Sequence, residues 1–138
     1  MWKWVERLQD KFQDFKARPA ADALGDRGEN AAASYLRGQG YRIILRNFRC
    51  ELGEVDIIAR KGDTLVFVEV KTREQDEPTP EEQVNNTKQH QVTKAAKFYM
   101  SRYGTPRPPA RFDVIAVIWP TGREPQIRHV ENAFEATI

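Results

Sequence analysis

The alternation of hydrophobic and polar positions predicts two helices in the first part of the chain. Between residues 1 and 18, apolar side chains recur at spacings of three and four, which is the period of an amphipathic helix. Pro19 ends this helix, and a second helix is expected to begin with Asp22 as its N-cap and to end near Gly38. We therefore expect an N-terminal amphipathic helix at residues 1–18 and a domain at residues 22–138.

After residue 40 the pattern changes to runs rich in Ile, Val and Phe, which favour strands. The third of these runs is apolar on both faces, as in a central strand covered on both sides. The expected elements, in order, are strands at about 41–48, 54–60 and 65–71, a helix at 81–103, and strands at 111–119 and 126–130. An antiparallel hairpin is thus joined to a strand that is reached through a helical crossover. The predicted fold class is α/β, with one mixed sheet flanked by helices.

Composition narrows the class of protein. The chain has 138 residues, of which 40% are hydrophobic and 30% charged, as expected for one globular domain with a core. No stretch approaches the roughly 18 unbroken apolar residues of a membrane span, and the charged N-terminal segment is unlike a signal peptide, so we expect a soluble, cytoplasmic protein. Only Cys50, His90 and His129 could serve as soft ligands. They cannot make a structural zinc site, so any catalytic metal must be held by oxygen.

The most informative anomaly is a pair of charges in the most apolar strand. Glu69 and Lys71 lie in this strand and, being two residues apart, point to the same face. The preceding strand carries Asp56 in an otherwise apolar run. An uncompensated buried charge costs several kcal/mol, which is comparable to the stability of a small domain. These residues must therefore be paired with other charges or have a function.

The register of the hairpin decides whether the two acids meet. If Gly62-Asp63 is a two-residue hairpin loop, Lys61 pairs with Thr64. The same register places Asp56 opposite Glu69, with Cβ atoms about 5 Å apart. A slip of one residue would move Asp56 to the other face. We predict that the two carboxylates face each other.

Two carboxylates at that distance require a proton or a cation between them. A hard divalent ion, Mg²⁺ or Mn²⁺, bound by the carboxylates, a backbone carbonyl and waters, meets this requirement. The alternative is a structural ion-pair cluster in which Lys71 neutralises Asp56 and Glu69 without a metal. The residues alone leave both interpretations open.

A basic stretch follows the proposed site. No Asp or Glu occurs from Gln83 to Phe112, whereas six cationic residues do. They are Lys88, Lys94, Lys97, Arg102, Arg107 and Arg111. The net charge of +2 therefore conceals an uneven distribution of charge along the chain. The basic stretch suits contacts with phosphate, but it also fits a helix face that is exposed to solvent.

Two segments carry a family resemblance. Gly53–Ala59 and Val66–Arg73 resemble the signature of the YraN-like bacterial family of the PD-(D/E)xK nuclease superfamily, which is similar to archaeal Holliday-junction resolvases and restriction endonucleases. The resemblance covers most of the chain and excludes the helix at residues 1–18. It also takes in Gly28-Glu29, Lys88-Gln89, Arg111–Val114 and Asn132–Phe134. It implies a restriction-endonuclease-like fold.

The resemblance also implies roles for site residues. Asp56 and Glu69 would be ligands of Mg²⁺ or Mn²⁺, with the carbonyl of Val70 as a third ligand. Lys71 would orient the attacking water or stabilise charge on the phosphate. Glu29 matches a helix acid that supports the metal site in related nucleases. Residues expected to contact DNA are Lys88, Gln89, Lys94, Lys97 and Arg73.

Two functions follow from these expectations. The first is a metal-dependent endonuclease that acts on structured or branched DNA. The second is a catalytically silent nucleic-acid-binding or adaptor module with the same fold. No membrane partner is expected, because an anionic bilayer would repel the acidic residues of the N-terminal helix. That helix is expected to pack on its own domain or on a second subunit, which leaves a homodimer open.

Overall fold

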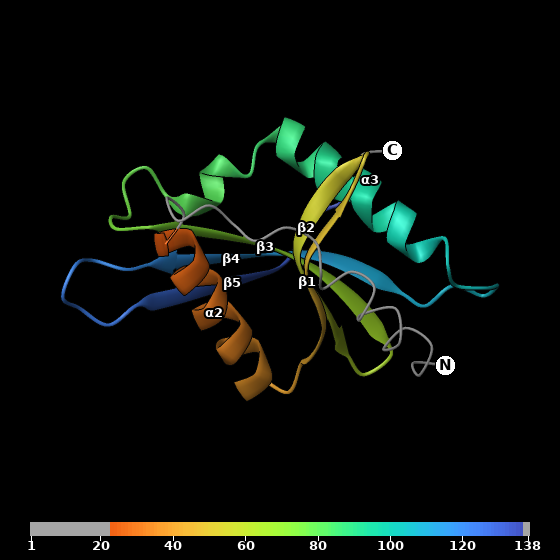
Figure 1. Ribbon diagram of the computed structural model, residues 1–138, viewed down its shortest axis with the longest axis horizontal. Helices are drawn as coiled ribbons and strands as arrows, with labels where there is room; N and C mark the ends of the chain where they lie inside the picture. Colours follow the sequence, from red (N-terminus) through yellow and green to blue (C-terminus); the bar gives the residue numbers. More distant parts are fainter. Residues whose placement is uncertain (1–22, 137–138) are drawn as a thin grey trace.

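A computed structural model of the chain describes residues 23–136. The expected helix at residues 1–18 and the expected cap at Asp22 lie outside these described residues. The elements are, in chain order, α2 (Ala23–Gly38), β1 (Arg42–Cys50), β2 (Gly53–Lys61), β3 (Thr64–Arg73), the 3₁₀ helix η2 (Pro80–Gln83), α3 (Asn86–Met100), β4 (Ala110–Ile118) and β5 (Gln126–Phe134) (Figure 1).

The strands form one mixed sheet in the order β1-β2-β3-β4-β5. Neighbouring strands are antiparallel except β3 and β4, which are parallel. A parallel pair needs a long crossover, which η2 and α3 supply. The predicted α/β class is confirmed, and the arrangement is consistent with a restriction-endonuclease-like fold.

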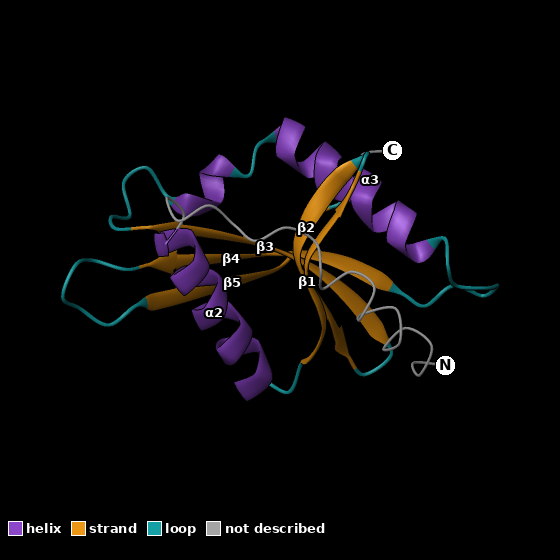
Figure 2. Cartoon of the chain, in the orientation of Figure 1, coloured by secondary structure: helices purple, strands orange, loops and turns teal. Residues whose placement is uncertain are grey.

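The two long helices cover opposite faces of the sheet (Figure 2). Helix α2 packs Ala32 and Leu36 in the same cluster as Val66 of β3. Helix α3 packs Tyr99 in the other cluster, with Phe67 of β3. Because side chains alternate along a strand, both faces of β3 are buried, which confirms the prediction of a central strand.

The helix predicted at residues 81–103 is two elements. Helix η2 ends at Gln83 and α3 begins at Asn86. Asn85 is in an extended conformation and caps α3, because its side chain accepts a hydrogen bond of 3.0 Å from the Lys88 amide. Hydrophobic periodicity continues across this joint and therefore does not reveal it. Among residues 23–136, no helix has the length and apolar character needed to cross a bilayer.

Candidate active site

The site is located where β2 and β3 stop pairing. The two strands pair in the predicted register, from Lys61 opposite Thr64 to Ile57 opposite Val68. The ladder ends there, and the carboxylate of Asp56 accepts a hydrogen bond of 2.8 Å from the amide of Val70. The register prediction is thus confirmed within the ladder. Beyond the end of the ladder, the Val70 amide donates to the side chain of Asp56 in place of a main-chain carbonyl of β2.

Both acids nevertheless lie at the same cavity. A cavity of about 270 Å³ is lined by Asp56, Glu69, Val70 and Lys71, together with Arg49, Glu54, Gln83, Val84 and Lys88. Asp56, Glu69 and Lys71 thus meet at one cavity.

Glu69 is the most unusual group of the site. Its residue is only 3% exposed, and its Oε1 atom has no hydrogen-bond partner among the described residues. Burial, followed by the nearby charge of Asp56, raises the pKa of Glu69 well above its usual value, although Lys88 opposes this shift. The ionised carboxylate is therefore only partly compensated.

Lys88 at the start of α3 provides that partial compensation. Its Nζ atom lies 3.4 Å from Glu69 Oε2 and 3.3 Å from Glu54 Oε1. Burial lowers the pKa of Lys88, but the surrounding carboxylates outweigh this effect and the pKa is raised. The lysine paired with Glu69 is thus Lys88, whereas the sequence suggested Lys71 as the neutralising residue and Lys88 as a DNA contact.

Glu29 lies at a second, smaller cavity next to the first. This cavity of about 140 Å³ is lined by Gly25, Glu29, Asp56, Val70, Lys71 and Thr72. Glu29 is buried in α2, and its Oε1 atom accepts a hydrogen bond of 3.0 Å from Arg46 Nε. Asp56, Val70 and Lys71 line both cavities, which brings the expected catalytic residues together at one end of the sheet.

The oxygen atoms of this site fit a hard divalent ion. Among residues 23–136, no three His, Cys, Asp or Glu side chains are grouped so that they could hold a metal by themselves. A third ligand would therefore be a main-chain oxygen, the position assigned to the Val70 carbonyl. The partnerless Oε1 of Glu69 is an acceptor that such an ion would satisfy.

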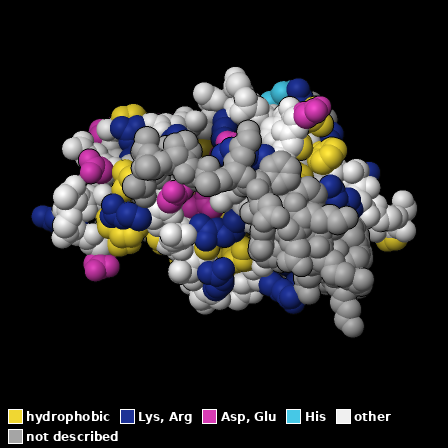
Figure 3. All heavy atoms as spheres, viewed as in Figure 1, with side chains coloured by type: hydrophobic (Ala, Val, Ile, Leu, Met, Phe, Trp, Pro, Cys, Tyr) yellow, Lys and Arg dark blue, Asp and Glu magenta, His cyan; other side chains and the backbone are white. Residues whose placement is uncertain are grey.

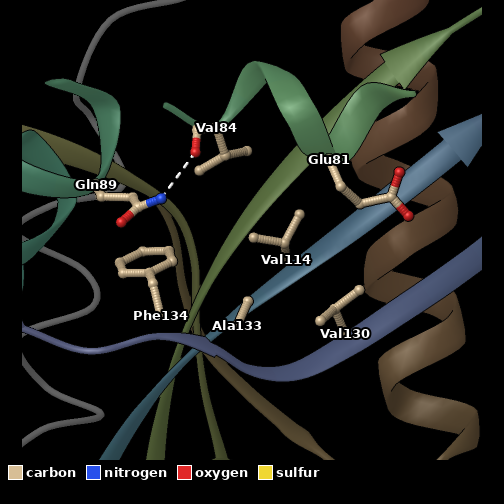
Figure 4. Close-up of a pocket in the computed structure, with 7 residues that line it drawn as sticks. All are labelled: Glu81, Val84, Gln89, Val114, Val130, Ala133 and Phe134. Carbon is tan, nitrogen blue, oxygen red and sulfur yellow. Dashed lines mark hydrogen bonds between the residues drawn. The ribbon is translucent and has the colours of Figure 1, made fainter. Parts of the chain in front are cut away.

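The other residues expected to contact DNA do not line either of these two cavities. Gln89 donates a hydrogen bond of 2.9 Å from Nε2 to the carbonyl of Val84 and lines a separate pocket (Figure 4). It therefore fastens α3 to η2. Lys97 is exposed on α3, and Lys94 and Arg73 are half-buried.

The basic stretch is less uniform than its sequence suggests. Acids in the fold pair with cations of this stretch, among them Lys88 with Glu69 and Arg111 with Asp113, whose Oδ1 lies 3.0 Å from Arg111 Nε. On the part of the surface that the described residues form in Figure 3, Lys and Arg side chains lie in separate places among Asp and Glu side chains.

Sequence reasoning missed a second polar cluster on the α2 face of the sheet. His129 lies with Nε2 2.7 Å from Oδ2 of the buried Asp113. Asp113 also accepts hydrogen bonds from Arg111 and from the Asn132 amide. Burial raises the pKa of Asp113, but these hydrogen bonds outweigh it and lower the pKa. The only sequence signal was the spacing of Arg111 and Asp113, which puts both on one face of a strand.

These features define an α/β domain with a restriction-endonuclease-like sheet and a partly buried site made of carboxylates and lysines. The chain belongs to the family described as "Uncharacterised protein family UPF0102", whose model matches residues 28–117. It is similar to UPF0102 proteins of three bacteria. The relative from Geobacter sulfurreducens is 53% identical over 81% of this chain and 88% of its own length. The relatives from Geotalea uraniireducens and Symbiobacterium thermophilum are 47% and 48% identical, each over 82% of this chain, and are covered over 90% and 97% of their lengths.

Proposed function

We propose that the chain is a metal-dependent endonuclease of the PD-(D/E)xK superfamily that hydrolyses phosphodiester bonds in structured or branched DNA. One observation carries the proposal: Glu69 is buried with a partnerless oxygen beside Asp56, at a cavity that Lys71 also lines. Such an arrangement costs stability in a domain without function. A cation bound between the two acids would remove that cost.

The side chains of Asp56 and Glu69 and the carbonyl of Val70 would hold Mg²⁺ or Mn²⁺. A bound ion would supply a Lewis acid that activates water and offsets charge on the phosphate. The hydrogen bond from the Val70 amide holds the Asp56 carboxylate in place, so this ligand needs little reorganisation. Glu29, held by Arg46, supports the same end of the sheet.

Lys71 would act on the substrate. In the hydrolysis, a water oxygen loses one proton and forms a bond to phosphorus, one bridging P–O bond breaks, and the leaving oxygen takes up a proton. Negative charge accumulates on the phosphate during this exchange, and an ammonium group at the cavity wall stabilises it. Lys71 lines the cavity. Because the ion pair of Glu69 is with Lys88, the Lys71 ammonium can contact the phosphate or the attacking water.

A second candidate function is a nucleic-acid-binding module without turnover. The observation that favours it is the ion pair of Lys88 with Glu69 and Glu54, which already gives the acids a cation from the chain itself. The two functions differ in whether a divalent ion binds at Asp56 and Glu69.

The test measures binding and cleavage separately on the purified chain. Mn²⁺ affinity is measured by calorimetry, and cleavage is measured on linear, flapped and four-way DNA. Asp56→Asn and Glu69→Gln should weaken Mn²⁺ binding and abolish cleavage, because each removes one ligand. Lys71→Ala should keep Mn²⁺ affinity and lose about 10²- to 10³-fold in rate, the usual range for one group that stabilises charge in the transition state.

Chelator provides the control for contaminating nucleases. Cleavage that persists in chelator, or three variants that retain full activity, would contradict the proposal. Absence of Mn²⁺ binding, together with no cleavage of any DNA in the panel, would favour the module without turnover.

A further inference from the structure

Lys88 lies between two carboxylates that differ in their surroundings. Glu54 is partly exposed, with a side chain 40% accessible, and its Oε2 also lies 3.0 Å from Arg49 Nε. Glu69 is buried next to Asp56. Lys88 is therefore held by one acid at the cavity edge and by one acid inside the candidate metal site.

We propose that Lys88 is a positioning residue that exchanges partners. In the metal-free protein it bridges Glu54 and Glu69. When a divalent ion occupies Asp56 and Glu69, Lys88 keeps its contact with Glu54 and turns its ammonium to a phosphate of the DNA. This inference rests on the proposed function, because it assumes that Asp56 and Glu69 bind the ion.

Electrostatics gives the direction of the exchange. An ion held by Glu69 would offset the negative charge that attracts Lys88 and would add a like charge nearby, where repulsion is substantial in a partly buried site. Glu54 continues to attract Lys88 at 3.3 Å. The ammonium therefore leaves Glu69 and stays beside the partly exposed Glu54.

The movement can be confined to the side chain. The N-terminus of α3 is capped by Asn85, and the β1–β2 turn lies directly on its backbone: a Cβ atom on Gly53 would lie 2.1 Å from the Gln91 carbonyl oxygen. The helix is thus held in place, whereas the four-carbon stem of a lysine rotates freely.

A phosphodiester is the partner that this cavity suits. Arg49, Lys71 and Lys88 all line it, so an entering phosphate meets cations once the acids are neutralised. Because coupling between two ligands is reciprocal, metal binding should tighten DNA binding through Lys88.

The first measurement is Mn²⁺ affinity by calorimetry without DNA. Lys88→Met should tighten Mn²⁺ binding about tenfold, because it removes a positive charge that competes with the ion for Glu69. A single nearby charge commonly moves the pKa of a carboxyl group by about one to three units, and it should change the affinity of that group for a metal ion by a similar factor. Lys94→Met is the matched control, because Lys94 is also half-buried on α3 but does not line the cavity. Its Mn²⁺ affinity should equal that of the wild type. Lys88→Gln should behave like Lys88→Met.

The second measurement is DNA affinity as a function of salt, in a Lys71→Ala background so that the DNA is not consumed. In Mn²⁺, Lys88→Met should reduce the salt dependence of binding by about one counterion, as for a lost phosphate contact. In chelator it should have little effect, because Lys88 is then held by Glu69. Lys94→Met should have the same effect under both conditions.

The outcomes separate this inference from the proposed function. If Asp56→Asn leaves Mn²⁺ binding unchanged and no DNA is cut, both fail. If Asp56→Asn weakens Mn²⁺ binding but Lys88→Met does not tighten it, only the exchange by Lys88 is wrong. Equal effects of Lys88→Met on DNA binding in Mn²⁺ and in chelator would overturn the exchange as well.

Discussion

At the scale of single residues, the site is unusual for the amount of negative charge that it buries. Glu69 is buried beside Asp56, and its nearest cation, Lys88, is shared with Glu54. A protein selected for stability alone would place a neutral side chain at this position. The buried charge is therefore best explained by ligand binding. A bound ligand offsets the free-energy cost of burying the charge, and without the ligand this cost remains.

Glu69→Gln should stabilise the metal-free protein at neutral pH. The pKa of Glu69 is about 4.5 in the unfolded chain and is raised in the fold, so the folded chain binds more protons above this pH. Wild-type stability should therefore decrease as pH rises above about 4.5 toward the raised pKa, and the variant should lack this decrease. Urea unfolding in chelator between pH 4 and pH 8 measures both.

Glu54→Gln is the control for this stability measurement. Its side chain is partly exposed, so the loss of its ion pairs should cost at most about 1 kcal/mol. A Glu69→Gln variant that is less stable than the wild type at neutral pH, with an unchanged pH dependence, would show that Lys88 fully compensates the buried charge.

At the scale of elements, the position of α2 depends on a close approach to β3. A Cβ atom on Gly28 would lie 1.8 Å from Thr72 Oγ1, whereas a Cβ atom on Gly25 would meet no atom within 4 Å. Thr72 directly follows Lys71, and Glu29 directly follows Gly28. The same contact thus sets the helix against the sheet and brings Glu29 to the site.

Gly28→Ala should destabilise the protein and Gly25→Ala should not. The methyl group at residue 28 forces α2 away from Thr72, which commonly costs about 1–3 kcal/mol for overpacking. At residue 25 alanine has room and favours a helix by up to about 1 kcal/mol over glycine. The free energies of unfolding in urea compare the two variants. Equal stabilities would mean that α2 does not pack so closely on β3.

At the scale of the whole molecule, two core clusters on opposite faces of one sheet hold the described domain together. Both clusters draw on β2, β3 and β4, and each has its own helix. The family model matches residues 28–117, so the shared part of the chain contains most of both clusters. The N-terminal segment lies outside this match.

Deletion of residues 1–18 should leave a domain that unfolds cooperatively. The core residues of both clusters lie in the part of the chain that remains, and they bury both faces of the sheet. Urea unfolding of the shortened chain, followed by fluorescence and by circular dichroism, should give coincident transitions. Loss of a single transition would show that the segment is part of the core.

The sequence determined the features that depend on the periodicity of one strand or one hairpin. The two-residue Gly62-Asp63 turn predicted the pairing of Lys61 with Thr64, and the apolar run of β3 predicted a central strand covered on both faces. These predictions succeed because side chains alternate strictly along a strand and a tight turn sets the register.

Tertiary structure alone decided which charges meet. Lys88 and Glu69 belong to different elements, and so do Asp113 and His129, and no local pattern links either pair. Lys88 reaches the cavity from the first turn of α3, whose N-terminus Asn85 caps. Periodicity gives the direction of a side chain relative to its own backbone, whereas its partner depends on how the helices pack on the sheet.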